Sequence, residues 1–241
     1  MTTLREAAQA RSAGYPSLAA RPSERRMSED PTASRRGAVR VDIKPGDLRE
    51  IERNGMTVVR VGGMASVTGQ PYEMWDMFGP YDEIVARGVF TEALASDPAV
   101  EFNLNHGKSG GASMASTLND TLDLREILDG DPTGFDFDAF VDPRRGDVQD
   151  MLLALERRDL QGASFRFMIT SGRWNDAFTQ YTITGIDLDR GDVSSVNFGA
   201  NPAAWSELRS TTTGTPPAEG RGASMARRRD VPDDEWTRPR H

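Results

Sequence analysis

The sequence predicts an α+β or mainly β fold in which strands outnumber helices. Three observations support this prediction. Residues 56–67 (MTVVRVGGMASV) are rich in β-branched side chains, which strands favour. Several later segments alternate apolar and polar residues with the period of two that half-buried strands show. Residues 147–158 (DVQDMLLALERR), in contrast, place four apolar residues at helical spacing, with acids early and arginines late, and predict a helix.

The first part of the predicted domain consists of a strand, a loop and a short helix. The pair Gly62-Gly63 predicts a bend or a bulge in the strand at 56–67. Gly and Pro residues punctuate 69–83 (GQPYEMWDMFGPYDE), so this segment is expected to be a loop. Residues 91–96 (TEALAS) are expected to form a short helix with Thr91 as its N-cap.

The rest of the predicted domain is mainly strand. Residues 99–107 (AVEFNLNHG) predict a strand that runs out at its histidine, so that His106 lies at a strand end. Segments 116–128 and 135–142 alternate with a period of two and are joined by DGDPTG, which predicts a hairpin. The remaining strands are expected at 163–170 (ASFRFMIT), 180–188 (QYTITGIDL) and 192–198 (DVSSVNF).

The chain divides into three parts. Residues 1–40 contain eight arginines and four acids with no sustained apolar period, so they are expected to form a disordered basic arm. Residues 209–241 are rich in Pro, Gly and Thr and then in charges, and are expected to form a disordered tail. Residues 41–208 contain enough large apolar side chains for one folded domain with a single core.

Charge and composition exclude several classes of function. Residues 41–206 carry 27 acidic and 14 basic side chains, a net charge of −13, so nucleic acid is not an expected partner. The chain has no cysteine, which excludes disulfides, thiolate catalysis and Cys-based zinc sites. One histidine in the predicted domain cannot make a His-rich zinc site, so no metal and no cofactor are expected. No apolar run approaches the roughly 20 residues that span a bilayer, so a soluble protein without a membrane partner is expected.

His106 is the only histidine of the predicted domain, because His241 lies at the end of the chain. An imidazole is the usual base that activates a serine, since its unperturbed pKa lies near neutrality. The alternative is a partly buried histidine bonded to backbone at a strand end, and for an isolated histidine this alternative is the more common case. His106 alone therefore does not define a site.

Ser164 follows two small residues in QGASFRF, so its hydroxyl can face an open cleft. On a strand, Ser164 and Arg166 point to one face, while Phe165 and Phe167 point to the other and anchor the strand in the core. Taken alone, Ser164 is also an ordinary strand residue. No G-x-S-x-G motif surrounds it, which argues against an esterase of the α/β-hydrolase type.

Asp192 is one of three candidates for the acid that orients a catalytic histidine. Asp187 and Asp189 lie close by in the sequence, and spacing does not choose among the three. The alternative for Asp192 is a turn residue that begins a strand.

Five segments occur in an order and at spacings that resemble the tailed-phage (caudoviral, HK97-type) prohead proteases, a family related to the herpesvirus assembly proteases. The resemblance covers most of residues 56–206. The five segments are GGMASV at 62–67, IVARGVF at 84–90, FNLNHG at 102–107, LQGASFRF at 160–167 and DVSSVNFGANPAAW at 192–205.

This resemblance implies a compact antiparallel β-barrel flanked by helices, with His106 as the general base and Ser164 as the nucleophile. The segment DVS corresponds to the family's EVS, so Asp192 stands where a glutamate is common. It becomes the third catalytic residue if its shorter side chain reaches the histidine. Arg166 replaces a frequent glycine, and an outward salt bridge is expected for it rather than assistance to the oxyanion.

The resemblance also implies the substrates and the place of action. We expect a serine endopeptidase that cleaves the major capsid protein, the scaffold protein and itself inside the immature prohead, in the host cytoplasm. Herpesvirus relatives favour an Ala-Ser bond, so Ala33-Ser34 and Ala223-Ser224 are candidate autocleavage sites. The alternative function is a catalytically silent module that keeps the protease fold for scaffold binding or assembly.

Overall fold

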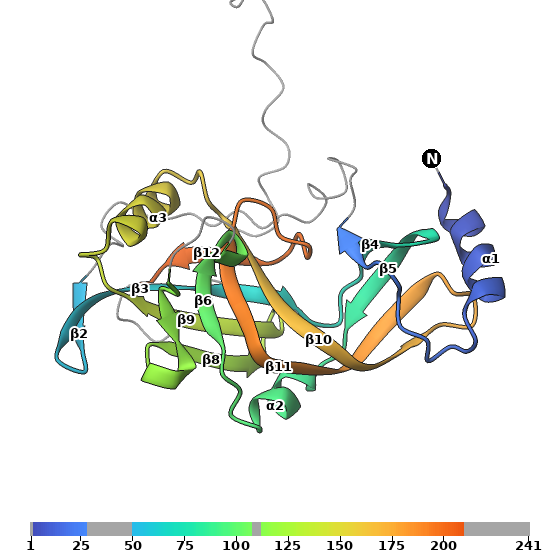
Figure 1. The fold of residues 1–241 in the computed structure, drawn as a ribbon, viewed down its shortest axis with the longest axis horizontal. Coiled ribbons are helices and arrows are strands. Elements are labelled where there is room, and N and C mark those ends of the chain that lie inside the picture. The colour runs from blue at the N-terminus through green and yellow to red at the C-terminus, as the bar shows by residue number, and fades with distance from the viewer. Residues whose placement is uncertain (1, 28–49, 108–111, 210–241) are drawn as a thin grey trace, which may run out of the picture.

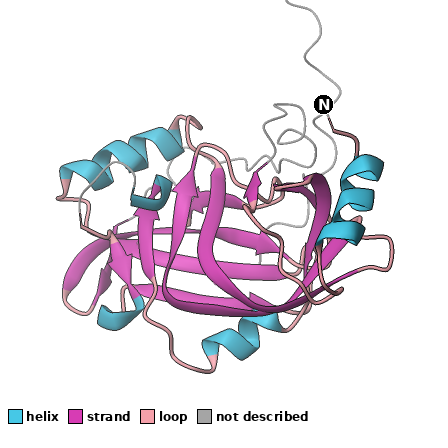
Figure 2. Ribbon diagram, turned by 45° about the vertical axis from the view of Figure 1, so that its right-hand side comes forward, coloured by secondary structure: helices cyan, strands magenta, loops and turns pink. Residues whose placement is uncertain are grey.

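Two β-sheets pack face to face and enclose the hydrophobic core. The structure, a computed structural model, describes residues 2–27, 50–107 and 112–209. Helices lie around the sheets, with α1 at one end and α3 at the other (Figures 1 and 2). Within the described residues, no helix is long and apolar enough to cross a membrane.

The first sheet is built around one long strand, β11. Strand β10 pairs with β11 along one edge, while β5 and β6 pair with the two halves of the other edge in parallel orientation. The strand order is β1-β4-β5-β11-β6-β7, with β10 beside β11. The strands are β1 (Arg26–Met27), β4 (Tyr72–Asp76), β5 (Gly79–Val85), β6 (Glu101–Leu104), β7 (Ala115–Ser116), β10 (Gly162–Trp174) and β11 (Gln180–Val196).

The second sheet is antiparallel and has the order β12-β3-β9-β8, with β2 beside β3. The predicted hairpin of β8 and β9 and the predicted long strand β3 are both confirmed. The strands are β2 (Glu50–Arg53), β3 (Met56–Val67), β8 (Leu122–Ile127), β9 (Gly134–Val141) and β12 (Trp205–Leu208).

The fold is mostly β with a few helices, as the sequence predicts, but the expected closed antiparallel barrel is not seen. Each sheet keeps free edges among the described residues, at β1 and β7 in the first and at β8 in the second. Two of the pairings of β11 are also parallel rather than antiparallel.

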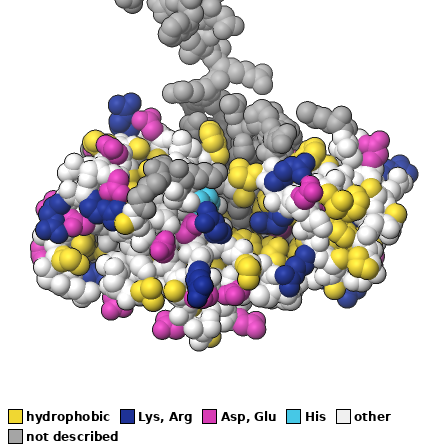
Figure 3. Space-filling model, in the orientation of Figure 1, with side chains coloured by type: hydrophobic (Ala, Val, Ile, Leu, Met, Phe, Trp, Pro, Cys, Tyr) yellow, Lys and Arg dark blue, Asp and Glu magenta, His cyan; other side chains and the backbone are white. Residues whose placement is uncertain are grey.

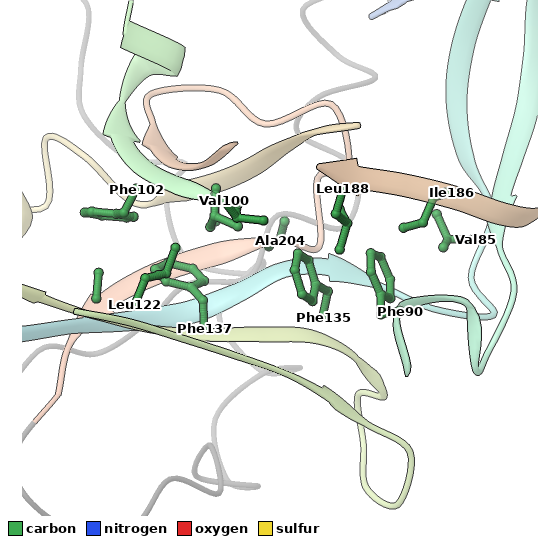
Figure 4. Close-up of a cluster of buried hydrophobic side chains, with 14 of the residues drawn as sticks. Val85, Phe90, Val100, Phe102, Leu122, Phe135, Phe137, Ile186, Leu188 and Ala204 are labelled. Atoms are coloured by element: carbon green, nitrogen blue, oxygen red, sulfur yellow. The ribbon is translucent and has the colours of Figure 1, made fainter. Parts of the chain in front are cut away.

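Aromatic side chains from both layers fill the core (Figure 4). Phe90 stacks on Phe135 with ring centroids 4.4 Å apart, and Phe102 lies 5.6 Å from Phe137. Phe165 on β10 meets Phe135 edge to face. These contacts hold the strands that carry the candidate site against the second sheet.

The predicted helix α3 (Gly146–Glu156) is confirmed, and its four predicted apolar positions are its buried ones. Helix α2 (Val89–Leu94) is also present, but Thr91 is not its N-cap. Gly88 takes that position with a φ of 87°, a left-handed conformation that glycine adopts without strain. The Thr91 hydroxyl instead donates a 2.7 Å hydrogen bond to Glu126.

The segment predicted to be a loop at 69–83 contains the antiparallel strands β4 and β5. Every second residue of both strands is buried, as in any half-buried strand. Two of the buried positions hold acids, Asp76 and Glu83, which hides the alternation in the sequence. Their partners are Arg11 and Arg25, which lie far away along the chain.

Residues 2–27 belong to the arm that was expected to be disordered, but the structure describes a helix and a short strand there. Helix α1 (Leu4–Gly14) begins with a capping box at Thr3 and packs against β5. Its fully buried Arg11 forms a 2.9 Å ion pair with Asp76, which is also fully buried. The buried face of α1 consists of two alanines and Arg11, and the ion pair of Arg11 compensates for its charge. The helix therefore shows no apolar periodicity in its sequence. The remainder of the arm and nearly all of the predicted tail lie outside the described residues.

Candidate active site

Three neighbouring strands bring the candidate residues together. Strand β11 carries Asp192 and Ser194, and β10 places Ser164 opposite Ser194. Strand β6 pairs with the same part of β11 and ends directly before the turn that contains His106. Because strand side chains alternate between faces, the side chains of Asp192, Ser194 and Ser164 all project from one face of the sheet.

The backbone of His106 is held in an unusual conformation. Asn105, His106 and Gly107 have φ angles of 49°, 58° and 68°, so two non-glycine residues in succession are left-handed. The His106 N–H donates a 3.2 Å hydrogen bond to Ser194 Oγ. Its carbonyl accepts a 3.2 Å hydrogen bond from Arg166 Nη2. Such strain persists only where the surroundings fix it, and it is concentrated at functional sites.

The imidazole of His106 is oriented by Asp192. The distance from His106 Nδ1 to Asp192 Oδ1 is 2.6 Å. A carboxylate accepts hydrogen bonds, so Nδ1 carries the proton and Nε2 is left free to accept one. The Asp192 side chain is 5% exposed and that of His106 is 21% exposed. The carboxylate is therefore shielded from solvent, while the imidazole is partly exposed.

Asp192 is held in its ionised form by its surroundings. Burial is the largest single influence and raises the pKa of Asp192. The hydrogen bond and charge of His106, the hydrogen bond from Ser194 and the charge of Arg166 together outweigh it. The net effect lowers the pKa from its ordinary value. Ser194 Oγ donates to Asp192 Oδ1 at 2.8 Å, and Arg166 Nη1 lies 3.5 Å from Oδ2.

Ser164 and His106 open onto one pocket of about 230 Å³. Ser164 Oγ has no hydrogen-bond partner among the described residues, and no hydrogen bond joins it to the imidazole. Catalytic hydrogen bonds are often loose before substrate binds, so Ser164 stays the candidate nucleophile. Figure 3 shows histidine atoms at the surface beside basic side chains. The pocket is lined by Arg25, Arg26, Met27, Ala65, Tyr72, Met74, His106, Ser164, Phe165, Phe167, Ala200 and Asn201.

Of the three candidate acids, only Asp192 contacts His106. Asp187 Oδ1 accepts from the backbone N–H of Asp189, and Asp189 Oδ1 accepts from that of Ala99. The Arg166 guanidinium turns toward Asp192 and the His106 carbonyl, and not outward as expected.

Two parts of the site are absent from the sequence-based prediction. Ser194 bridges the His106 backbone and Asp192, and its position two residues after Asp192 on a strand was the available signal. Residues 25–27 line the pocket from a segment expected to be disordered, and no sequence pattern links them to the site.

An imidazole oriented by a buried carboxylate, sharing a pocket with a serine, is the arrangement of the serine hydrolases. Within the described residues, no cluster of His, Asp or Glu is arranged to hold a metal ion. A family model described as caudovirus prohead serine protease matches residues 46–215. The chain therefore belongs to the caudovirus prohead serine protease family. No curated protein and no solved structure matches the chain.

Proposed function

We propose that this protein is a serine endopeptidase that cleaves scaffold and capsid-protein segments, and itself, during prohead maturation. The observation that carries the proposal is the 2.6 Å contact between His106 and Asp192 beside the pocket that contains Ser164. Family membership supplies the setting, which is the inside of an immature prohead in the host cytoplasm. The major capsid protein and the scaffold protein are the partners that this setting offers.

The residues support a two-step acyl transfer. Ser164 Oγ attacks the peptide carbonyl carbon while His106 Nε2 takes the hydroxyl proton. The bond from carbon to nitrogen then breaks, and His106 returns the proton to the leaving amine. Water, deprotonated by the same nitrogen, hydrolyses the acyl-enzyme and releases Ser164. Asp192 remains ionised throughout and stabilises the imidazolium that forms in each step.

Self-cleavage is supported best at Ala33-Ser34. Both candidate bonds lie outside the described residues, so only their distance along the chain is informative. Ala33 is six residues after Met27, which lines the pocket, and six extended residues span at most about 20 Å. Ala223 is 14 residues after Arg209, the last described residue, which is not among the pocket residues.

The proposal is tested by co-expressing the chain with the capsid and scaffold proteins encoded beside it and measuring the intact mass of every product. The wild type should trim both partners and itself, and the Ser164→Ala variant should leave all of them whole. Ser171→Ala is the matched control, because Ser171 is an exposed serine on the same strand outside the pocket. It should cleave like the wild type.

Two outcomes contradict the proposal. Trimming that persists in Ser164→Ala would assign the nucleophile elsewhere. Uncut capsid and scaffold proteins in the wild type, with shells still assembling, would favour the silent assembly module. For self-cleavage, replacing Ala33 with Val should block the shortening of the N-terminus. If the variant's N-terminus is shortened to the same mass as that of the wild type, Ala33-Ser34 is not the bond that is cleaved.

A further inference from the structure

The N-terminal segment, defined as residues 15–27, lies beside strand β10 and ends at the candidate active-site pocket. The backbone N–H of Trp174 on β10 donates to the Leu18 carbonyl at 2.7 Å, and the Trp174 indole N–H donates to the Ala20 carbonyl at 2.9 Å. The last two residues of the segment form β1, which pairs with β4 in antiparallel orientation. The segment precedes the region that the family model matches.

A buried ion pair fixes the segment to the domain. Arg25 Nε and Nη2 lie 2.7 and 2.5 Å from the two carboxylate oxygens of Glu83, whose side chain is 0% exposed. The hydroxyls of Tyr72 and Tyr81 donate to the same carboxylate. Detaching the segment would leave this carboxylate buried without its cation, which is strongly unfavourable. The segment is therefore a fixed part of the domain and not an occupant that substrate displaces.

The strand register of β1 decides which of its side chains faces the pocket. Met27 pairs with Met74, which is 1% exposed and lines the pocket. Arg26 pairs with Trp75, which does not line the pocket, and its guanidinium lies 5.8 Å from the centre of the Trp75 ring. Directly paired side chains of a sheet share one face, and successive side chains of a strand point to opposite faces. Met27 therefore faces the pocket, while the charge of Arg26 lies on the other face of the sheet.

Apolar side chains form most of the pocket wall. Phe165 and Phe167 stack with ring centroids 4.3 Å apart. Met27 is 38% exposed, so part of its surface is available to a bound molecule. An unbranched, polarizable methionine side chain adapts its shape to apolar partners. The other wholly apolar members of the wall are Ala65, Met74 and Ala200.

The polar side chains on the pocket side of the wall, other than His106 and Ser164, already have partners within the protein. The charge of Arg25 is neutralised by Glu83, and the Tyr72 hydroxyl donates to the same acid. The Asn201 amide donates to one backbone carbonyl and accepts from one backbone N–H, at 3.3 and 3.0 Å. A charged substrate side chain in this pocket would lose water without gaining a free counter-charge, which is unfavourable. The wall therefore suits an apolar side chain.

We propose that the pocket binds an apolar substrate side chain near the scissile bond and that Met27 is a specificity-determining residue that supplies part of the wall. This inference rests on the proposed protease function. Met27 lies outside the region that the family model matches, so family membership does not supply this contact.

The test uses synthetic peptides that span the capsid cleavage site mapped by the co-expression experiment. Leu or Glu is placed in turn at each of the four positions on either side of the bond. The wild type should prefer Leu by about tenfold or more in kcat/KM at the position that enters the pocket. Met27→Ala should lower kcat/KM for that Leu peptide about threefold to fourfold, the size of one buried methylene group. Met27→Arg should raise kcat/KM for the matching Glu peptide about threefold to fivefold, the size of an exposed ion pair.

Controls separate the contact of Met27 from general effects of substitution. Met77→Ala and Met77→Arg change a methionine that is 55% exposed and does not line the pocket, so both should keep the wild-type preference. Met27→Leu retains an apolar wall and should also keep it. Thermal unfolding of the Met27 variants should stay close to that of the wild type, because this side chain is partly exposed.

The outcomes distinguish the inference from the proposed function. A wild type that cleaves its peptides without preferring Leu at any position would overturn the inference and leave the protease intact. The same holds if Met27→Arg keeps the wild-type ratio of Leu to Glu cleavage at every position. A wild type that cleaves no peptide and no capsid protein would overturn the function itself.

Discussion

Two groups of buried aspartates, one on each sheet, differ in what surrounds them. On β9, Asp136 and Asp138 are 1% and 2% exposed, and within the part of the chain that the structure describes both carboxylates form ion pairs with arginines. On β11, Asp192 is 4% exposed but is paired with a histidine and a serine as well as an arginine. We call the first group the arginine cluster, and its cations are Arg60, Arg125 and Arg209.

The comparison shows that a buried aspartate does not by itself mark an active site. The arginine cluster pairs its carboxylates with guanidinium groups, and none of its members lines the pocket of Ser164. Its effect is to hold Arg209, at the end of β12, against the second sheet. Around Asp192, one partner is an imidazole, the usual general base of enzymes, and it faces the pocket that also contains Ser164. An imidazole partner and access to a pocket therefore distinguish Asp192, the candidate catalytic acid, from the aspartates of the arginine cluster.

The largest expected effect is that of Asp192→Asn on catalysis. The amide no longer holds the Nδ1 proton or stabilises the imidazolium, so kcat should fall by about 10⁴ while the fold is retained. Cleavage of the mapped capsid peptide and circular dichroism measure the two properties. Asp138→Asn is the matched control on the other sheet, and its folded fraction should keep wild-type kcat. Equal loss of kcat in both variants would abolish the distinction between the two groups.

The second prediction concerns stability. Arg209→Met removes a guanidinium that contacts both aspartates of the arginine cluster. We expect unfolding to become easier by about 3 kcal/mol, the lower end for a broken buried pair, because Arg125 still contacts Asp136. Urea unfolding measures this loss. The exposed pair of Arg144 and Asp142 supplies the control, and Arg144→Gln should leave the midpoint unchanged.

A smaller effect is expected for Ser194→Ala. The variant loses the hydrogen bonds to Asp192 and to the His106 backbone, but the contact between these two residues remains. Stability should fall by about 1 kcal/mol and kcat by about tenfold. Steady-state kinetics and urea unfolding on the same sample test both values, with Ser171→Ala as the control. An unchanged kcat would show that Ser194 only fills space.

The smallest effect is a change in acid sensitivity. The pKa of Asp192 in the folded protein is lowered from 3.8, so its ionised form stabilises the fold above the ordinary pKa. This stabilisation is lost as the pH falls through the lowered value. Asp192→Asn cannot titrate, so its free energy of unfolding should fall less steeply below about pH 4. Urea unfolding across an acidic pH series measures the slope, and slopes that match the wild type would contradict the lowered pKa.

Much of the fold follows from local sequence pattern. The hairpin of β8 and β9, helix α3 and the strand β3 obey simple periodicities and were predicted. The glycine pair of β3 was predicted to mark a bend or a bulge, and the register shift of this strand lies just after the pair, between Met64 and Ser66. A side chain at Gly62 would collide with Arg209 and Asp138, so this glycine makes room for the arginine cluster.

The rest depends on contacts between distant parts of the chain. Strands β4 and β5 bury acids whose arginine partners come from residues 11 and 25, so neither the strands nor the N-terminal helix shows an apolar pattern. In the site, residue types and family resemblance indicated His106, Ser164 and Asp192. Spacing alone did not choose among Asp187, Asp189 and Asp192, and only the resemblance favoured Asp192. In the structure the strand register places Asp192 beside β6, and its carboxylate contacts the imidazole.

The most direct test of the central claim, that His106 activates Ser164, is covalent labelling with a fluorophosphonate. An activated serine hydroxyl displaces fluoride from phosphorus and gains the phosphonyl group, without any need to know the natural substrate. Digestion and tandem mass spectrometry then locate the adduct. We predict one adduct, on Ser164, which is lost in Ser164→Ala and strongly slowed in His106→Ala. An adduct on another serine, or equal labelling of Ser164 without His106, would contradict the account.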